Sequence, residues 1–208
     1  MKFFETDSVL NSGPVIPVLA LNADETLEPM AEALVAGGIK VFEVVLRTPS
    51  ALEVIKRLNG RVPILGAGTI LNKSQMLEAQ KAGATFCVSP GLTEQIHLAA
   101  VELEMPLLPG AVTASEIMNA RELNYRNLKF FPAERSGGPA ALADFAAVFP
   151  DSRFCPTGGV SAENASLYLE NKNVSSVGGS MATPRKFVME KDWAGLQRHV
   201  EKLIQSLT

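Results

Sequence analysis

A lysine stands inside a short apolar run, Leu128-Lys129-Phe130-Phe131, which Pro132 ends. The segment Asn127–Phe131 has the length of a strand. Apolar neighbours strip water from a primary amine and disfavour its ammonium form. A neutral lysine amine attacks ketones and forms Schiff bases, so this segment indicates carbonyl chemistry. The alternative is a lysine whose stem packs on its neighbours while the amine reaches solvent.

Glu43 and Arg47 form a second chemical pattern within an apolar stretch. The two-residue period of a strand puts both on one face, opposite Phe42 and Val44. They lie too far apart along one strand to pair, so each needs another partner. A carboxylate there would exchange protons with a nearby amine, and the arginine would help to keep that amine neutral. The alternative is a pair of charges that only fills the floor of the fold.

Two glycine pairs occur late in the chain, in Thr157-Gly158-Gly159-Val160-Ser161 and in Gly178-Gly179-Ser180. Glycine lets a backbone approach an anion closely, and Ser180 adds a hydroxyl group. We expect residues 157–161 to open a helix and to bind phosphate with backbone N–H groups. Glycines that serve only tight turns are the alternative.

Strand-like runs recur at intervals of roughly 21–25 residues, with helix-like stretches between them, which is the length of one βα unit. Several helix-like stretches end at glycine, as at Gly37 and Gly83. The predicted strands are Val15–Leu19, Lys40–Leu46, Pro63–Ala67, Thr85–Ser89, Pro106–Leu108, Asn127–Phe131, Arg153–Pro156 and Val174–Val177.

Eight such units predict an α/β fold: a single-domain (β/α)8 TIM barrel over residues 1–208, with an extra N-terminal helix at Phe3–Leu10. A doubly wound open sheet is the alternative, but the first strand–helix junction, Ala20–Asp24, lacks a glycine fingerprint for a dinucleotide. In a barrel, active sites lie at the carboxyl ends of the strands. Arg47, Thr69 and Pro90 all follow predicted strands closely, as that architecture requires.

Composition excludes several classes of protein. The chain is 47% hydrophobic and 20% charged, as expected for a soluble globular protein. A net charge of −3 and an isoelectric point near 5.5 argue against a nucleic-acid partner. No apolar window has the length of a membrane helix, so we expect no membrane partner. Acidic residues near the N-terminus interrupt any signal-peptide core, and we expect a cytoplasmic protein.

Cysteine and histidine are scarce. Cys87 and Cys155 each fall in a strand-like run, which predicts buried thiols rather than a disulfide. His97 and His199 lie in separate helix-like segments without a partner at ligand spacing. We therefore expect neither a histidine metal site nor a histidine-activated nucleophile.

Several specific segments follow one another along almost the whole chain. With them, the sequence resembles the bacterial 2-keto-3-deoxy-6-phosphogluconate (KDPG) aldolases, also called 4-hydroxy-2-oxoglutarate (KHG) aldolases. The segments are Glu43-Val44-Val45-Leu46-Arg47-Thr48, Gly66-Ala67-Gly68-Thr69, Ser89-Pro90-Gly91-Leu92-Thr93, Lys129-Phe130-Phe131-Pro132-Ala133-Glu134 and Pro156-Thr157-Gly158-Gly159.

The resemblance implies roles for individual residues. Lys129 matches the Schiff-base lysine and Glu43 the proton-transfer carboxylate. The expected substrate-binding residues are Arg47, Thr69 and Pro90 around the pyruvate moiety, Phe131 in the pocket wall, and Thr157, Gly158, Gly159, Gly179 and Ser180 at the phosphate end.

The resemblance also implies a cytoplasmic class I aldolase that needs no cofactor or metal and usually forms homotrimers. We expect reversible cleavage of KDPG to pyruvate and glyceraldehyde 3-phosphate. The galactonate epimer of KDPG, and KHG, which yields glyoxylate, share the pyruvate half and remain open as substrates. Arg135-Ser136 and Met181 depart from the usual pattern, and the former would alter preference for the aldehyde half.

Two other functions stay open at this point. A barrel isomerase or epimerase shares the late glycine turns but has no need of an interior lysine. A non-catalytic barrel that binds sugar phosphates would keep the architecture without the chemistry. Reductive trapping with pyruvate separates both from a Schiff-base aldolase.

Overall fold

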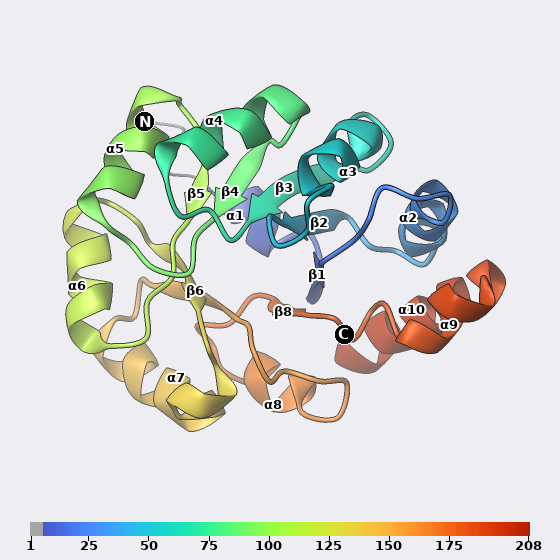
Figure 1. The fold of residues 1–208 in the computed structure, drawn as a ribbon. Helices are drawn as coiled ribbons and strands as arrows, with labels where there is room; N and C mark the ends of the chain where they lie inside the picture. Colours follow the sequence, from blue (N-terminus) through green and yellow to red (C-terminus); the bar gives the residue numbers. More distant parts are fainter. Residues whose placement is uncertain (1–5) are drawn as a thin grey trace.

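Strands and helices alternate along the computed structural model, which describes residues 6–208 (Figure 1). The strands are β1 (Val15–Leu19), β2 (Val41–Val45), β3 (Ile64–Gly68), β4 (Phe86–Val88), β5 (Leu107–Leu108), β6 (Asn127–Phe130), β7 (Arg153–Pro156) and β8 (Val177–Gly179). The helices are α1 (Asp7–Leu10), α2 (Leu27–Ala36), α3 (Ala51–Leu58), α4 (Lys73–Ala82), α5 (Glu94–Glu102), α6 (Ala114–Glu122), η2 (Glu134–Ser136), α7 (Gly138–Val148), α8 (Ala165–Leu169), α9 (Arg185–Glu190) and α10 (Trp193–Leu207).

All strand pairs are parallel. Six strands form a curled sheet in the order β5-β4-β3-β2-β1-β8, and β6 pairs with β7. The last strand therefore lies beside the first, and the helices from α2 onwards lie outside the strands (Figure 1). Single β-bridges join Gly110 to Lys129 and Thr157 to Gly178. The α/β class with a parallel sheet, predicted from the βα repeat, is confirmed.

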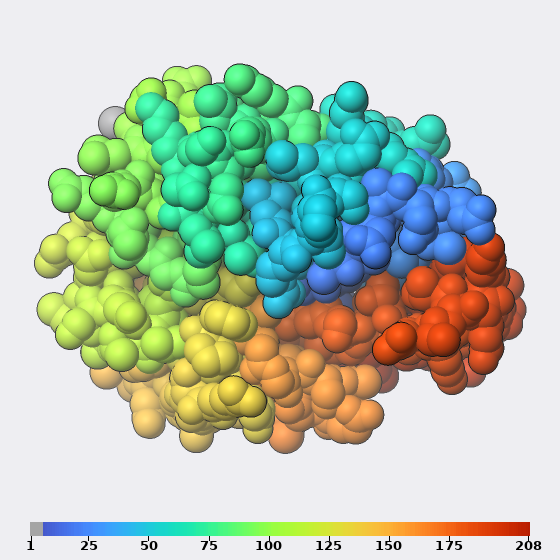
Figure 2. Space-filling model, viewed as in Figure 1, coloured from blue at the N-terminus to red at the C-terminus, as the bar shows by residue number. Residues whose placement is uncertain are grey.

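Helices α2 and α10 lie side by side in the outer layer, where the blue and red segments of Figure 2 adjoin. At Gly37 the contact is so close that a Cβ atom would lie 2.7 Å from Val200 Cβ. Glycine is needed there because no side chain fits between the two helices. Within residues 6–208, no helix is long and apolar enough to cross a membrane.

The first seven predicted strands agree with β1–β7 to within one residue at each end. The prediction for the last strand, Val174–Val177, is wrong: β8 begins at Val177 and includes Gly178 and Gly179. Glycine is depleted in strands, which made this pair look like a turn. The structure uses Gly178 because a Cβ atom would lie 2.3 Å from Thr157 Oγ1.

The predicted N-terminal helix spans residues 3–10, of which residues 3–5 lie outside the described part of the chain. The described part contains α1, whose Val9 and Leu10 are buried. Both belong to the inner apolar cluster with Ile16 and Phe86 from the strands. This short helix therefore covers the end of the strand interior opposite the carboxyl ends.

Strand alternation separates an inner from an outer apolar layer. Val41 joins the inner cluster, whereas Phe42 and Val44 pack beneath the helices. The interior face of β2 therefore carries Glu43, as the sequence predicted. The two thiols are also buried, Cys155 in the inner layer and Cys87 in the outer layer, as predicted.

Candidate active site

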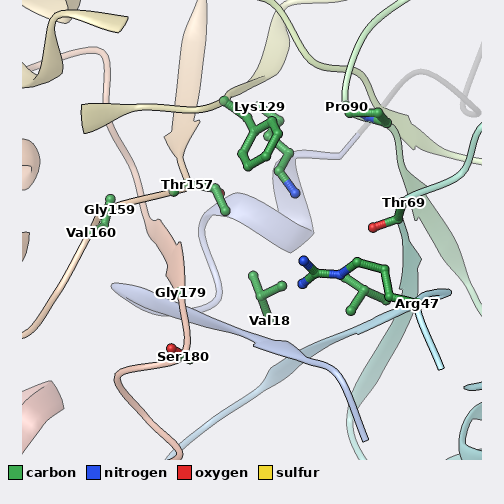
Figure 3. A pocket seen from close by; sticks show the side chains of 13 residues that line it. Val18, Arg47, Thr69, Pro90, Lys129, Thr157, Gly159, Val160, Gly179 and Ser180 are labelled. Atoms are coloured by element: carbon green, nitrogen blue, oxygen red, sulfur yellow. The ribbon is translucent and has the colours of Figure 1, made fainter. Parts of the chain in front are cut away.

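A cavity of about 320 Å³ opens at the carboxyl ends of the strands (Figure 3). Its lining comes from segments that are far apart in sequence. The lining residues are Val18, Val45, Arg47, Thr69, Pro90, Lys129, Phe131, Thr157, Gly158, Gly159, Val160, Gly179 and Ser180. The structure thus brings every site residue expected from the sequence to this cavity except Glu43. Glu43 does not line the cavity but contacts Lys129, which does.

Lys129 and Glu43 form a buried ion pair across the interior. Lys129 Nζ, from β6, donates to Glu43 Oε1, from β2, over 3.0 Å. Only 7% of Lys129 and 3% of Glu43 is exposed, yet the lysine side chain lines the cavity. The sequence predicted that this carboxylate exchanges protons with a nearby amine, and the two groups lie at hydrogen-bond distance. The amine becomes a nucleophile when its proton passes to an oxygen already at hydrogen-bond distance.

Arg47 lies beyond the end of β2 in the turn that follows it. Its guanidinium reaches into the cavity below the Lys129 amine (Figure 3). It forms no ion pair with any carboxylate of residues 6–208, so its charge is available to an anion in the cavity. Guanidinium binds carboxylate with two parallel hydrogen bonds, which suits an oxo acid.

Thr69 directly follows β3 with a left-handed backbone, φ 61°. This conformation is costly for a β-branched residue, and such strain concentrates at functional sites. Its hydroxyl faces the cavity, and Pro90 lines the cavity beside it after β4 (Figure 3). Together the two residues form the wall next to Arg47.

Phe131 lines the cavity next to Lys129. Lys129 Nζ lies 5.4 Å from the centroid of the Phe131 ring, within the range of a cation–π contact. The ring is 38% exposed at the mouth of the cavity. It therefore shields the amine from bulk water on one side.

The turn after β7 has two consecutive left-handed glycines, Gly158 at φ 95° and Gly159 at φ 83°. Among residues 6–208, the amides of Gly159 and Val160 find no hydrogen-bond acceptor. Unpaired N–H groups next to a cavity suit an anion. The prediction that residues 157–161 open a helix is wrong, because α8 begins only at Ala165.

Three lining residues were not predicted: Val18, Val45 and Val160. Alternation along β1 and β2 carries a signal for the first two, since each shares the inward parity of Ile16 or Glu43. Val160 carries no comparable signal. These three give the cavity the apolar wall that small-molecule sites usually have.

Cys155 lies in the interior on β7, opposite Lys129 in the register of β6 and β7. Burial raises the pKa of the Cys155 thiol to about 11, while the charges of Glu43 and Lys129 act on it in opposite directions. The thiol therefore stays protonated at neutral pH and does not compete with Lys129 as a nucleophile. Within residues 6–208, no group of three His, Cys, Asp or Glu side chains is arranged to hold a metal ion.

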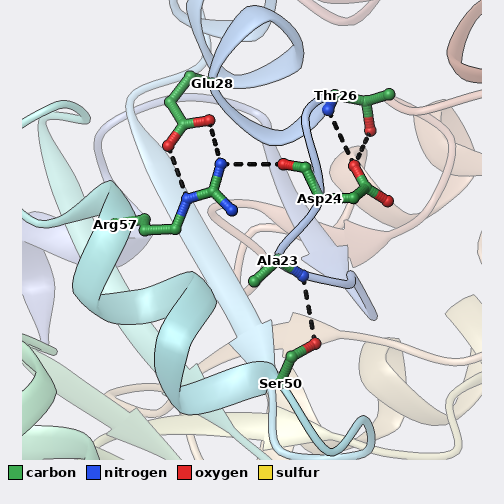
Figure 4. Close-up of polar contacts among 6 residues, drawn as sticks. All are labelled: Ala23, Asp24, Thr26, Glu28, Ser50 and Arg57. Atoms are coloured by element: carbon green, nitrogen blue, oxygen red, sulfur yellow. Dashed lines mark hydrogen bonds and ion pairs between the residues drawn. The ribbon is translucent and has the colours of Figure 1, made fainter.

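The loop after β1 is held in place by Arg57 of α3 (Figure 4). Arg57 Nε donates to Glu28 Oε1 over 2.8 Å, and Nη2 donates to the carbonyl oxygen of Asp24 over 2.9 Å. Ser50 Oγ accepts from the Ala23 amide over 3.2 Å. These contacts connect the loop to the segment that carries Arg47.

A family model described as "KDPG and KHG aldolase" matches residues 6–199. A 2-dehydro-3-deoxy-phosphogluconate aldolase from Pseudomonas aeruginosa is 46% identical over 199 residues, which cover 95% of this chain and 90% of that protein. The KDPG aldolase of Legionella pneumophila, with pyruvate captured as a covalent carbinolamine, superposes with a TM-score of 0.90 at 39% identity, over 95% and 97% of the two chains. The 2-keto-3-deoxy-6-phosphogluconate aldolase of Zymomonas mobilis, with 3-phosphoglycerate, gives 0.90 at 44% identity, over 97% and 96%.

Proposed function

The chain belongs to the KDPG and KHG aldolase family, and on that premise we propose that Lys129 forms its Schiff base and Glu43 moves its protons. The protein is a carbon–carbon lyase that cleaves KDPG to pyruvate and glyceraldehyde 3-phosphate. The observation that carries the assignment of residues is the 3.0 Å contact between Lys129 Nζ and Glu43 Oε1 at the base of the cavity.

The reaction begins when Lys129 transfers its proton to Glu43 and attacks the C2 ketone. The carbinolamine that forms takes this proton back from Glu43 on its hydroxyl group and loses water. The product is a protonated imine, which withdraws electrons from the C3–C4 bond, and Glu43 is again a carboxylate. Glu43, through a water molecule, removes the proton of the C4 hydroxyl as that bond breaks. Glyceraldehyde 3-phosphate leaves, and the electron pair remains at C3 as an enamine. Protonation at C3 and hydrolysis then release pyruvate and the free amine.

The two ends of the substrate are assigned to opposite sides of the cavity. Arg47 holds the C1 carboxylate, with Thr69 and Pro90 beside it. The phosphate lies at the turn of Gly158 and Gly159, where two amides are unpaired. Further residues of the phosphate end are Thr157, Gly179 and Ser180. Contacts at both ends orient the bond that breaks and convert binding energy into rate.

KHG is a second substrate on this assignment, because it shares the carboxylate, the C2 ketone and the C4 hydroxyl group that Arg47, Lys129 and Glu43 engage. The galactonate epimer differs from KDPG in the configuration at C4, the carbon that carries the hydroxyl group assigned to Glu43. Arg135 and Ser136 do not line the cavity, so any effect on the aldehyde half has to be indirect. The values of kcat/KM for KDPG, for its galactonate epimer and for KHG measure which of the three substrates the enzyme prefers.

We also infer a closed (β/α)8 barrel. Three observations support closure. The last strand, β8, pairs with the first, β1. Single bridges join β6 to the residue Gly110 after β5, and β8 to the residue Thr157 after β7. A doubly wound sheet would leave its first strand in the middle and its last strand at an edge. A cytoplasmic location and a homotrimer rest on the family resemblance, and analytical ultracentrifugation tests the latter.

Reductive trapping tests the proposal directly. Pyruvate with borohydride should add one covalent adduct to Lys129, located by peptide mass spectrometry. Lys129→Arg keeps a cation beside Glu43 but cannot form a Schiff base, and it should give neither adduct nor turnover. An adduct on another lysine, or KDPG cleavage by this variant, would remove Lys129 from the mechanism.

A further inference from the structure

Glu134 connects η2 to the turn after β7 and to the segment that follows this turn. Glu134 Oε2 accepts from Tyr168 Oη over 2.6 Å and from Asn164 Nδ2 over 3.3 Å. The backbone amide of Glu134 donates to the carbonyl oxygen of Gly158 over 3.0 Å. One residue of η2 thus contacts both the turn and the helix that follows it.

Glu134 and the turn after β7 are tightly packed against each other. A Cβ atom on Gly159 would lie 2.5 Å from Glu134 Cβ, so the Glu134 side chain packs directly against the backbone of Gly159. Asn164 Nδ2 also donates to the carbonyl oxygen of Gly159 over 3.1 Å, and its Oδ1 accepts from the Ser161 amide over 2.8 Å. The turn is therefore held by the side chain of Asn164, which bonds to Gly159 and Ser161, and by Glu134, which bonds to Gly158.

Tyr168 fixes the far end of this network. It is fully buried on α8, and its hydroxyl is directed at Glu134. Burial, and then the bond to Glu134, raise the pKa of the Tyr168 phenol, so it remains a donor. Within residues 6–208, Glu134 forms no ion pair with Lys, Arg or His, and it does not line the cavity.

We propose that Glu134 is a positioning residue that sets the preference for a phosphorylated substrate by holding the Gly158–Gly159 turn in place. This inference rests on the proposed function, since it takes the turn to be the phosphate end. The bonds of Glu134 to Tyr168 and Asn164 keep the amides of Gly159 and Val160 directed at the phosphate. The pyruvate end depends on Arg47, Thr69 and Pro90, and none of these forms a hydrogen bond with Glu134, Asn164 or Tyr168.

Two variants test the network with different chemistry. Glu134→Ala removes the carboxylate, and Tyr168→Phe removes the donor but keeps the ring. Each should raise KM for KDPG about tenfold, which corresponds to about 1.4 kcal/mol. The rate of reductive trapping with pyruvate, and kcat/KM on KHG, whose chain ends before the phosphate position, should stay within about twofold of wild type. The double variant should be no worse than Glu134→Ala, because both changes break one interaction.

Glu170→Ala is the matched control, since it removes an exposed carboxylate next to α8 that contacts neither the turn nor Tyr168. It should leave all parameters unchanged. Unchanged KM for KDPG in Glu134→Ala, or an equal loss of pyruvate trapping, would overturn the inference. Wild-type protein that neither traps pyruvate nor cleaves KDPG would instead overturn the proposed function.

Discussion

The carboxylate of Glu43 occupies the space that a side chain on Gly68 would need. A Cβ atom on residue 68 would lie 2.2 Å from Glu43 Oε1. The two residues face the interior from neighbouring parallel strands, β2 and β3. The missing side chain therefore allows the carboxylate to reach Lys129 Nζ.

Gly68→Ala should lower kcat for KDPG about 100-fold, because displacement of a catalytic group by about 1 Å costs that much. Gly66→Ala is the control: it lies on the same face of β3, but its Cβ atom would meet the Phe86 ring instead. Steady-state kinetics and thermal unfolding of both variants separate displacement of Glu43 from general loss of packing. Equal losses of kcat in the two variants would argue against the relationship.

Glu43→Gln should reduce kcat for KDPG by about 10²–10⁴, the usual contribution of a general acid–base group. The amide keeps the shape of the side chain but cannot take up the proton. Prolonged incubation with pyruvate and borohydride should still modify Lys129, because Schiff-base formation needs the amine. Glu28→Gln serves as control, since Glu28 lies outside the cavity and binds Arg57. Normal turnover by Glu43→Gln would exclude the carboxylate from proton transfer.

Arg47→Met should raise KM about 10- to 100-fold, which corresponds to loss of a charged hydrogen bond worth about 1.5–3 kcal/mol. The loss should be similar for KDPG and KHG, because both carry the C1 carboxylate. Arg126→Met is the matched control: Arg126 precedes β6 and pairs with Asp151 over 3.1 Å outside the cavity, so KM should not change. A larger effect on KDPG alone would place Arg47 at the phosphate end instead.

Sequence reasoning predicted much of this site because strand parity is a local property. Apolar Phe42 and Val44 face the helices, and this alone directs Glu43 inward. Repeat length then predicted the carboxyl ends where Arg47 and Thr69 lie. The contact of Lys129 with Glu43 joins residues 86 positions apart, and its length depends on how neighbouring strands are staggered. Parity gives the face of a strand but not the reach of a side chain across the interior.

The errors concern glycine. Gly178 lies inside β8, where Thr157 occupies the space that a side chain would need. Gly158 and Gly159 instead form a left-handed turn, and α8 begins only at Ala165. In the sequence the two pairs look alike. What distinguishes them is the neighbour that each one meets, and that neighbour comes from another part of the chain. Tertiary contact therefore decides between strand and turn for such pairs.

The two buried thiols should make the protein sensitive to alkali. Burial raises the pKa of Cys87 to about 12 and that of Cys155 to about 11, above the ordinary value of 9.0. Above pH 9 the thiols ionise in the unfolded chain but not in the folded chain. The free energy of unfolding is therefore highest below pH 9 and declines towards pH 11–12. The decline is at most about 1.4 kcal/mol per pH unit for each thiol. Urea unfolding under reducing conditions at pH 8.5 and 10.5 measures the decline. Cys87→Ala leaves a small cavity and lowers stability at both values, but its decline with pH should be shallower than that of wild type. An identical decline in the two proteins would show that ionisation of Cys87 does not contribute.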